Sequence, residues 1–276
     1  SKLGSSNWEQ EKPLLEQISN LYEEHKAEQD PEKKKVLYSK IDEVSQEASK
    51  FAIANEYDKA ISSLGASGTN AHTWLDETVY KNNIPNNELE KWLKIEKERF
   101  SELTLRLFHT ELEAVYEEFN RAQDNDARLV NYELMDALFP THPNGQQTTL
   151  GKSEHLKNPS LEKMYAYFNT YYVANNMILS LSGNFNTDEA LVLIQKYFGD
   201  WRSGTVPVFP SYEEKEFKGK ESISIRATPI KAFVRGYRTP KNGDSDQQKV
   251  QLLHLLLSNK EGSGLLDQLN NTGKLA

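Results

Sequence analysis

A charged amino-terminal segment with apolar residues at helical spacing constrains the fold most. Four apolar residues recur there at intervals of one to three: Leu14, Leu15, Ile18 and Leu21. This spacing is typical of one face of a helix. In "QDPEKKK", Asp30 is placed to cap a second helix and Pro31 to begin it. The sequence therefore predicts a helical hairpin over residues 8–51.

An alternating pattern follows, after a short helix that ends at Gly65. In "TNAHTWLDETVYKNNIP", bounded by Gly68 and Pro85, the side chains alternate between two faces. One face carries Ala71, Thr73 and Leu75, and the other Asn70, His72 and Trp74. This pattern indicates a strand, a turn and a return strand. Helical patterns resume over residues 86–100 and 105–121. Because helices and a strand hairpin are mixed, the predicted class is α+β, an antiparallel sheet with helices packed on it.

The carboxyl-terminal half continues the mixture. Helices are predicted in "SLEKMYAYFNTYY", "DEALVLIQKYF", "DQQKVQLLHLLL" and "GSGLLDQL", and strands in "MILSLSG", "SISIR" and "AFVRGYRTP". Asn186 with Glu189 matches a capping box at the start of the second of these helices. The stretch "SGTVPVFPSYEEKE" contains two prolines and no period, so it is the predicted linker.

Composition excludes several classes of function. The 276 residues carry a net charge of −8 and include no cysteine. An acidic chain without a basic stripe disfavours nucleic acid as a partner, because phosphate binding needs clustered Lys and Arg. No apolar run approaches the roughly 18 residues of a membrane span. Without cysteine, disulfides, thiol catalysis and cysteine-type zinc sites are excluded.

The stretch "TELEAVYEEFNR" places four glutamates on one predicted helix. Its core face is predicted from four residues at steps of four, three and four: Phe108, Leu112, Val115 and Phe119. Glu113 and Glu117 fall opposite that face and are predicted to be solvent residues. Glu111 and Glu118 are seven residues apart, nearly in register after two turns, at the edge of the core face.

Two carboxylates at the edge of a buried face suggest a cation opposite them. A structural ion pair is the commonest explanation, and a metal is the alternative. Histidine partners are scarce, since no two of the six stand four residues apart and neither HExxH nor HxxEH is present.

Three segments in order resemble the pitrilysin/insulinase family of zinc peptidases. They are "LGASGTNAHTWLDETVY", "FHTELEAVYEEFNRA" and the stretch from "HPNGQQTTLGKSEHLKNP" to "ANNMILSLSGNF". The resemblance implies a zinc ion bound by two histidines of an HxxEH motif and by a glutamate on a later helix. Glu118 matches that metal ligand, and Glu111 matches its partner carboxylate. The general base is the glutamate of HxxEH, expected upstream of Ser1.

The family also implies a way to bind substrate. Asn70 and Ala71 match its "NA" pair on an edge strand, where a peptide adds as a further strand. From the sequence alone, a plain hairpin strand is the favoured explanation of "TNAHT". Thr78 and Tyr80 match family positions that favour packing, and His142 in "HPNG" is assigned to a structural loop.

The resemblance sets the expected organisation. Residues 1–207 are a first domain of the LuxS/processing-peptidase-like type, 208–219 the linker, and 220–276 the truncated start of a second, homologous domain. The parent protein is expected to be a zinc metallopeptidase acting on oligopeptides, completed by a carboxyl-terminal half or a partner subunit, and the fragment alone to be inactive. A non-catalytic scaffold or partner subunit of the same family is the alternative. A helical interaction module, with the acidic hairpin as its partner surface, is a third.

Overall fold

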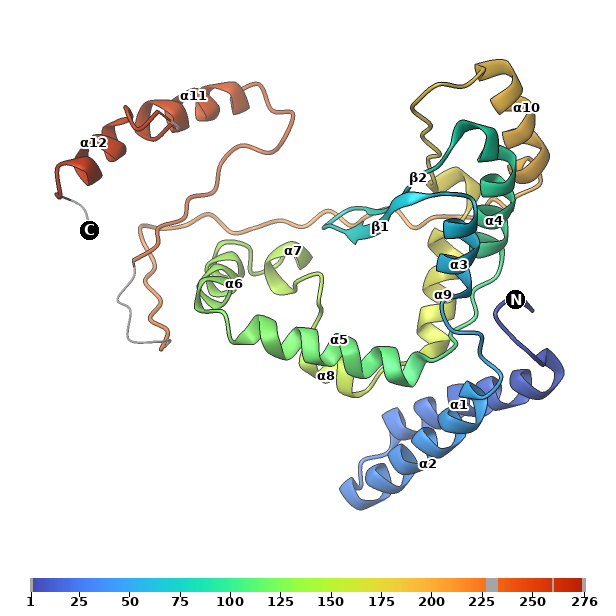
Figure 1. Ribbon diagram of the computed structural model, residues 1–276. Helices are drawn as coiled ribbons and strands as arrows, with labels where there is room; N and C mark the ends of the chain where they lie inside the picture. Colours follow the sequence, from blue (N-terminus) through green and yellow to red (C-terminus); the bar gives the residue numbers. More distant parts are fainter. Residues whose placement is uncertain (1, 227–232, 260, 275–276) are drawn as a thin grey trace.

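The computed structural model describes residues 2–226, 233–259 and 261–274, and most of its regular structure is helical (Figure 1). The α-helices are α1 (Trp8–Ala27), α2 (Pro31–Ser49), α3 (Glu56–Ser63), α4 (Leu89–Ser101), α5 (Phe108–Gln123), α6 (Asp126–Leu138), α7 (Pro143–Gln146), α8 (Ser153–Lys157), α9 (Leu161–Tyr171), α10 (Thr187–Phe198), α11 (Gln247–Leu257) and α12 (Leu265–Asn271). The strands are β1 (Ser67–Thr73) and β2 (Thr78–Asn83).

The predicted helical hairpin is confirmed, and its turn has the predicted chemistry. The Asp30 carboxylate accepts hydrogen bonds from the backbone N–H groups of Glu32 at 2.9 Å and Lys33 at 3.2 Å, and Pro31 opens α2. These contacts satisfy two of the donors that a helix start leaves unpaired. Helices α1 and α2 pack together along their apolar faces.

The main core lies where this hairpin meets the rest of the chain. Eight buried residues form it, from α1, α2, α5 and α9: Ile18, Leu21, Tyr22, Ile41, Val44, Ala48, Leu112 and Leu161. A buried ion pair adds to this junction, since Arg106, just before α5, binds the α1 residue Glu11.

The strand hairpin is also confirmed. Strands β1 and β2 form a two-stranded antiparallel sheet in which Ala71 pairs with Tyr80 and Asn70 with Lys81. A bulge interrupts the ladder between Ser67 and Asn70. The hairpin extends from the body that α3, α4 and α9 form (Figure 1).

Three predicted strands are wrong. The segments 177–183 and 222–226 contain no strand, and neither do residues 233–240, while residue 232 lies outside the described residues. The physical reason is pairing: a strand satisfies its backbone only through a neighbour, and in the described part of the chain these segments join no sheet. Ile178, for example, is 95% exposed.

The far carboxyl-terminal segment lies apart from the body. Between α10 and α11, residues 199–226 and 233–246 contain no helix or strand, and α11 and α12 pack on each other (Figure 1). The two helices confirm the last two helical predictions. No helix among the described residues is long and apolar enough to cross a bilayer.

Candidate functional site

Helix α5 carries the glutamates that match the family's metal-binding pattern. It begins at Phe108, three residues later than predicted, because Leu107 has a left-handed backbone with φ of 54°. Leu112 and Ala122 are the buried residues of α5. The predicted core face is therefore partly wrong, since Val115 is 38% exposed.

Glu111 and Glu118 are both exposed on α5. Their predicted place at the edge of a buried face is wrong, because the side of α5 that carries them, with Ala114 between them, is exposed. The structural ion pair is not found either: within the described residues, no ion pair involves these two carboxylates. Both side chains are thus open to a ligand or to solvent.

A catalytic zinc ion takes three protein ligands and keeps one position for water. Nowhere in the part of the chain that the structure describes do three His, Cys, Asp or Glu side chains gather as such a set. These residues alone therefore do not fit a zinc ion. Glu118 and Glu111 could contribute carboxylate oxygens only to a set completed by other ligands.

Glu113, predicted as a solvent residue, is exposed but has a structural contact. Its carboxylate accepts a short hydrogen bond from the Tyr38 hydroxyl on α2. Burial and this acceptor together raise the pKa of Tyr38. One helix turn earlier, His109 Nδ1 lies 2.8 Å from the Tyr22 hydroxyl of α1. This side of α5 is therefore the face that docks the helical hairpin.

Asn70 and Ala71, the residues predicted to bind substrate, lie on a strand edge that pairs with no further strand among the described residues. All seven residues of β1 are exposed. The Trp74 N–H donates to the Glu77 carbonyl at 2.8 Å, so that pair is a hydrogen-bonded one. Since such pairs alternate along an antiparallel ladder, the N–H and C=O groups of Ala71 and Thr73 point to the outer edge of β1.

Asn70 and Ala71 are directly linked at this edge. The Ala71 N–H donates to Asn70 Oδ1 at 2.9 Å. The side chain of Asn70 thereby satisfies an outward donor that no strand of the sheet uses. An added peptide strand would replace this acceptor with one of its own carbonyl groups.

The two candidate regions are not brought together by direct packing. Helix α5 packs on α2, α6 and α8, whereas β1 packs on β2. In Figure 1 the strand hairpin and α5 lie on separate levels of the body. Glu118 and Ala71 are therefore two separate features of the described residues, and no single site contains both.

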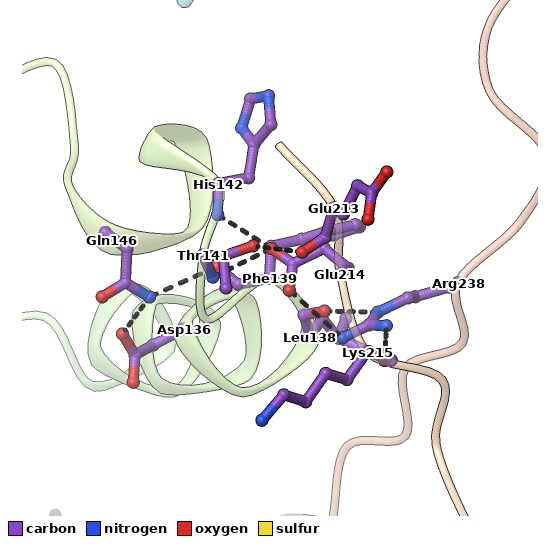
Figure 2. A network of polar contacts seen from close by, with 10 residues as sticks. All are labelled: Asp136, Leu138, Phe139, Thr141, His142, Gln146, Glu213, Glu214, Lys215 and Arg238. Atoms are coloured by element: carbon purple, nitrogen blue, oxygen red, sulfur yellow. Dashed lines mark hydrogen bonds and ion pairs between the residues drawn. The ribbon is translucent and has the colours of Figure 1, made fainter. Parts of the chain in front are cut away.

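A polar network anchors the predicted linker to the end of α6 (Figure 2). The Glu214 carboxylate accepts hydrogen bonds from the backbone N–H groups of Thr141 at 2.9 Å and His142 at 2.8 Å. Burial opposes ionisation of this carboxylate, but the two backbone donors, the Thr141 side chain and the charge of Arg238 together outweigh it and lower the pKa of Glu214. Arg238 lies 3.7 Å from Glu214 and donates to the Leu138 carbonyl.

His142 has the structural role predicted for it. Its Nδ1 accepts a hydrogen bond from the Asn144 N–H at 3.1 Å and so caps α7. Its ring packs edge-on against Tyr212 of the linker. The segment 208–219 is thus fixed to α6 and α7 at this point, and it is not a free connection.

Comparisons with known proteins find similarity to peptidases. A family model described as the Peptidase M16 inactive domain matches residues 159–276. An uncharacterized zinc protease of Mycobacterium leprae is 22% identical over 228 residues, which cover 81% of this chain and 51% of that protein. The beta subunit of the mitochondrial-processing peptidase of Bos taurus is 25% identical and covers 60% of this chain and 34% of its own length.

The fold has a counterpart among solved structures. The crystal structure of a protease from Helicobacter pylori matches with a TM-score of 0.52 at 24% identity, over 57% of this chain and 38% of that chain. The likeness covers the mixed helical fold with its small antiparallel sheet. The chain spans about half the length, or less, of the curated relatives it matches.

Proposed function

This chain is a relative of the M16 zinc peptidases, and we propose that it forms part of a zinc-dependent peptidase that hydrolyses peptide bonds in oligopeptides. The observation that carries the proposal is the pair Glu111 and Glu118, seven residues apart and both exposed on α5. Among the residues that the structure describes, no packing contact of α5 requires an acid at either position. A role in metal binding accounts for both.

In this proposal Glu118 is a zinc ligand and Glu111 orients it from outside the ligand set. The remaining ligands and the general base would have to be supplied by an HxxEH motif, which the 276 residues do not contain. When bound, zinc would supply the activated water for peptide hydrolysis. The chain's own contribution is to hold the carboxylates on α5, against the core that Leu112 enters.

The peptide is proposed to bind as a strand along the outer edge of β1. The outward main-chain groups of Ala71 and Thr73 can each pair with an extended peptide. Asn70 holds the Ala71 N–H in the right direction until a peptide carbonyl takes its place. A partner subunit, or a carboxyl-terminal half of the same protein, would enclose the bound peptide.

The second candidate is a non-catalytic member of the same family, acting as a scaffold or partner subunit. The observation that favours it is the description of the matching family model as an inactive domain. Under this interpretation Glu111 and Glu118 are surface residues, and no zinc is bound. The third candidate, a helical interaction module, requires no free strand edge, so the exposed β1 argues against it.

The deciding experiment measures zinc content and cleavage of a quenched fluorescent peptide library, with the protein extended upstream of Ser1. Glu118→Gln should abolish stoichiometric zinc and cleavage together. Glu117→Gln is the matched control, because Glu117 is the adjacent exposed glutamate of α5 and should retain both properties. A folded, extended protein that holds no zinc and cuts no peptide would support the non-catalytic candidate instead.

A further inference from the structure

A buried polar network lies behind the strand hairpin, and the proposed peptidase activity does not use it directly. Its centre is Glu96 of α4, which is 4% exposed. The Tyr57 hydroxyl of α3 donates to Glu96 Oε1 at 2.6 Å, and Asn82 Nδ2 of β2 donates to the Tyr57 oxygen at 3.2 Å. The network therefore links α3 and α4 to β2.

Arg99 completes the network from one turn further along α4. Its guanidinium lies 3.5 Å from the Glu96 carboxylate and donates to the Tyr57 hydroxyl at 2.8 Å. The same group lies over the ring of Tyr57 at 4.2 Å and over that of Tyr80 at 4.5 Å. A planar guanidinium can stack on aromatic faces and donate hydrogen bonds at the same time, so it is suited to link the two rings to Glu96.

The strand residues involved share one face of β2. Tyr80 and Asn82 are two positions apart, so both point toward α4. The Tyr80 hydroxyl also lies 2.8 Å from the hydroxyl of Tyr172, next to the end of α9. β2 is thus held by directional contacts as well as by apolar packing.

The position of β1 depends on this anchoring. β1 is fully exposed and packs on β2, where Ala71 lies opposite Tyr80 and Asn70 opposite Lys81. A shift of β2 relative to α4 would therefore carry the free edge of β1 with it. The hydrogen-bond ladder itself would stay intact.

We propose that Glu96 and Arg99 are positioning residues that fix the peptide-binding edge of β1 by anchoring Tyr80 and Asn82 of β2. The inference rests on the proposed function, since it assigns a purpose to the β1 edge. It adds residues that touch neither peptide nor metal and that act through the hairpin. Burial also raises the pKa of Glu96 and outweighs the opposing effects of Tyr57 and Arg99, as expected for a carboxylate deep in a packed layer.

The first test measures hairpin position without any catalytic readout. The chain contains no cysteine, so His72→Cys on β1 and Lys94→Cys on α4 give a unique pair of exposed sites for spin labels. In the 276-residue chain, Arg99→Met should broaden or shift the distance distribution between the labels. Arg106→Met is the matched control, because it also removes the arginine partner of a buried glutamate, Glu11.

The outcomes are distinct. A changed distribution for Arg99→Met with an unchanged one for Arg106→Met supports the inference. An unchanged distribution for Arg99→Met overturns it, and so does an equal change in both variants, which would reflect general loss of stability. Neither result depends on whether the protein cuts peptides.

The second test uses the protein extended upstream of Ser1 and a fluorogenic peptide. Arg99→Met should raise KM about tenfold with kcat little changed, the effect expected from roughly one lost strand hydrogen bond in both ground and transition states. Arg106→Met should leave KM as in the wild type. An active enzyme whose KM is unchanged by Arg99→Met overturns the inference. An inactive extended protein would contradict the proposed function, whereas the spin-label measurement would still decide whether Arg99 fixes the position of the strand hairpin.

Discussion

Replacing Arg106 by methionine should strongly destabilise the junction between the helical hairpin and α5. Arg106 Nε lies 2.8 Å from Glu11 Oε1 and 3.0 Å from Oε2, and Nη1 donates to the Leu3 carbonyl at 2.6 Å. Glu11 is 1% exposed, so Arg106→Met leaves a carboxylate in the interior without its cation. Removing one partner of a buried ion pair costs roughly 3–5 kcal/mol of unfolding free energy.

The assay is thermal and urea unfolding of the variants, followed by circular dichroism. A loss of that size should lower Tm by roughly 6–20 °C in a chain of this length. The double variant Arg106→Met with Glu11→Met should regain most of the loss, because two apolar side chains replace the whole pair. Lys35→Met, which removes a partner of the exposed Glu32, should change stability by less than about 1 kcal/mol.

Two results would refute this reasoning. A loss below about 1 kcal/mol for Arg106→Met would mean that the Glu11 carboxylate is hydrated or finds another donor. A double variant as unstable as the single one would mean that lost packing, and not an unpaired charge, causes the effect. Either result would leave the hairpin held to α5 mainly by the apolar core.

Three further predictions follow from individual contacts. Asp30→Ala should cost about 1 kcal/mol in urea unfolding, because it removes the acceptor at the start of α2. Glu214→Ala should release the linker from Thr141 and His142 and speed its cleavage in limited proteolysis. In the wild type, the stability that Glu214 contributes should be fully present above pH 4.5, the ordinary pKa of a glutamate. It should be lost as the pH falls through the lowered pKa of Glu214 in the folded protein. The pKa of Glu96 is raised, so its contribution to stability should be greatest below pH 4.5 and be lost as the pH rises through its pKa in the folded protein. Glu96→Gln should abolish this pH dependence, as measured by urea unfolding beside the wild type.

The helices and their ends could be predicted from the sequence because their determinants are local. Asp30 and Pro31 define the start of α2, and Gly65, with φ of 79°, follows the end of α3. The Asn186 side chain accepts from two backbone N–H groups at the start of α10, as its spacing to Glu189 predicts. Helix α6 was missed, since its apolar residues are only partly buried and give a weaker pattern.

The candidate site could be predicted only in part. Periodicity places Glu111 and Glu118 in one column of α5, but it cannot tell whether another element covers that column. The resemblance to zinc peptidases is confirmed, whereas the roles of these residues and of Asn70 and Ala71 remain predictions.

The anchoring network was missed, although α4 carries a signal for it. Leu93, Glu96 and Phe100 follow one another at steps of three and four and are the buried residues of that helix. A glutamate at a core position of a helix is rarely buried without a partner, so it predicts a cation or a donor facing it. Arg99 and the two tyrosines around it meet that requirement.

The wrong strands show why sheet structure is harder to predict from one segment than helix structure. A helix closes its backbone hydrogen bonds within the segment, so residues 187–198 need no other part of the chain to become α10. The segment 177–183 has an apolar pattern typical of a strand, but a strand closes its bonds on a neighbour. β1 and β2 form a sheet because the short turn between them brings each strand next to the other. Local pattern therefore determines which segments are able to pair, and the presence of a second backbone determines which of them do.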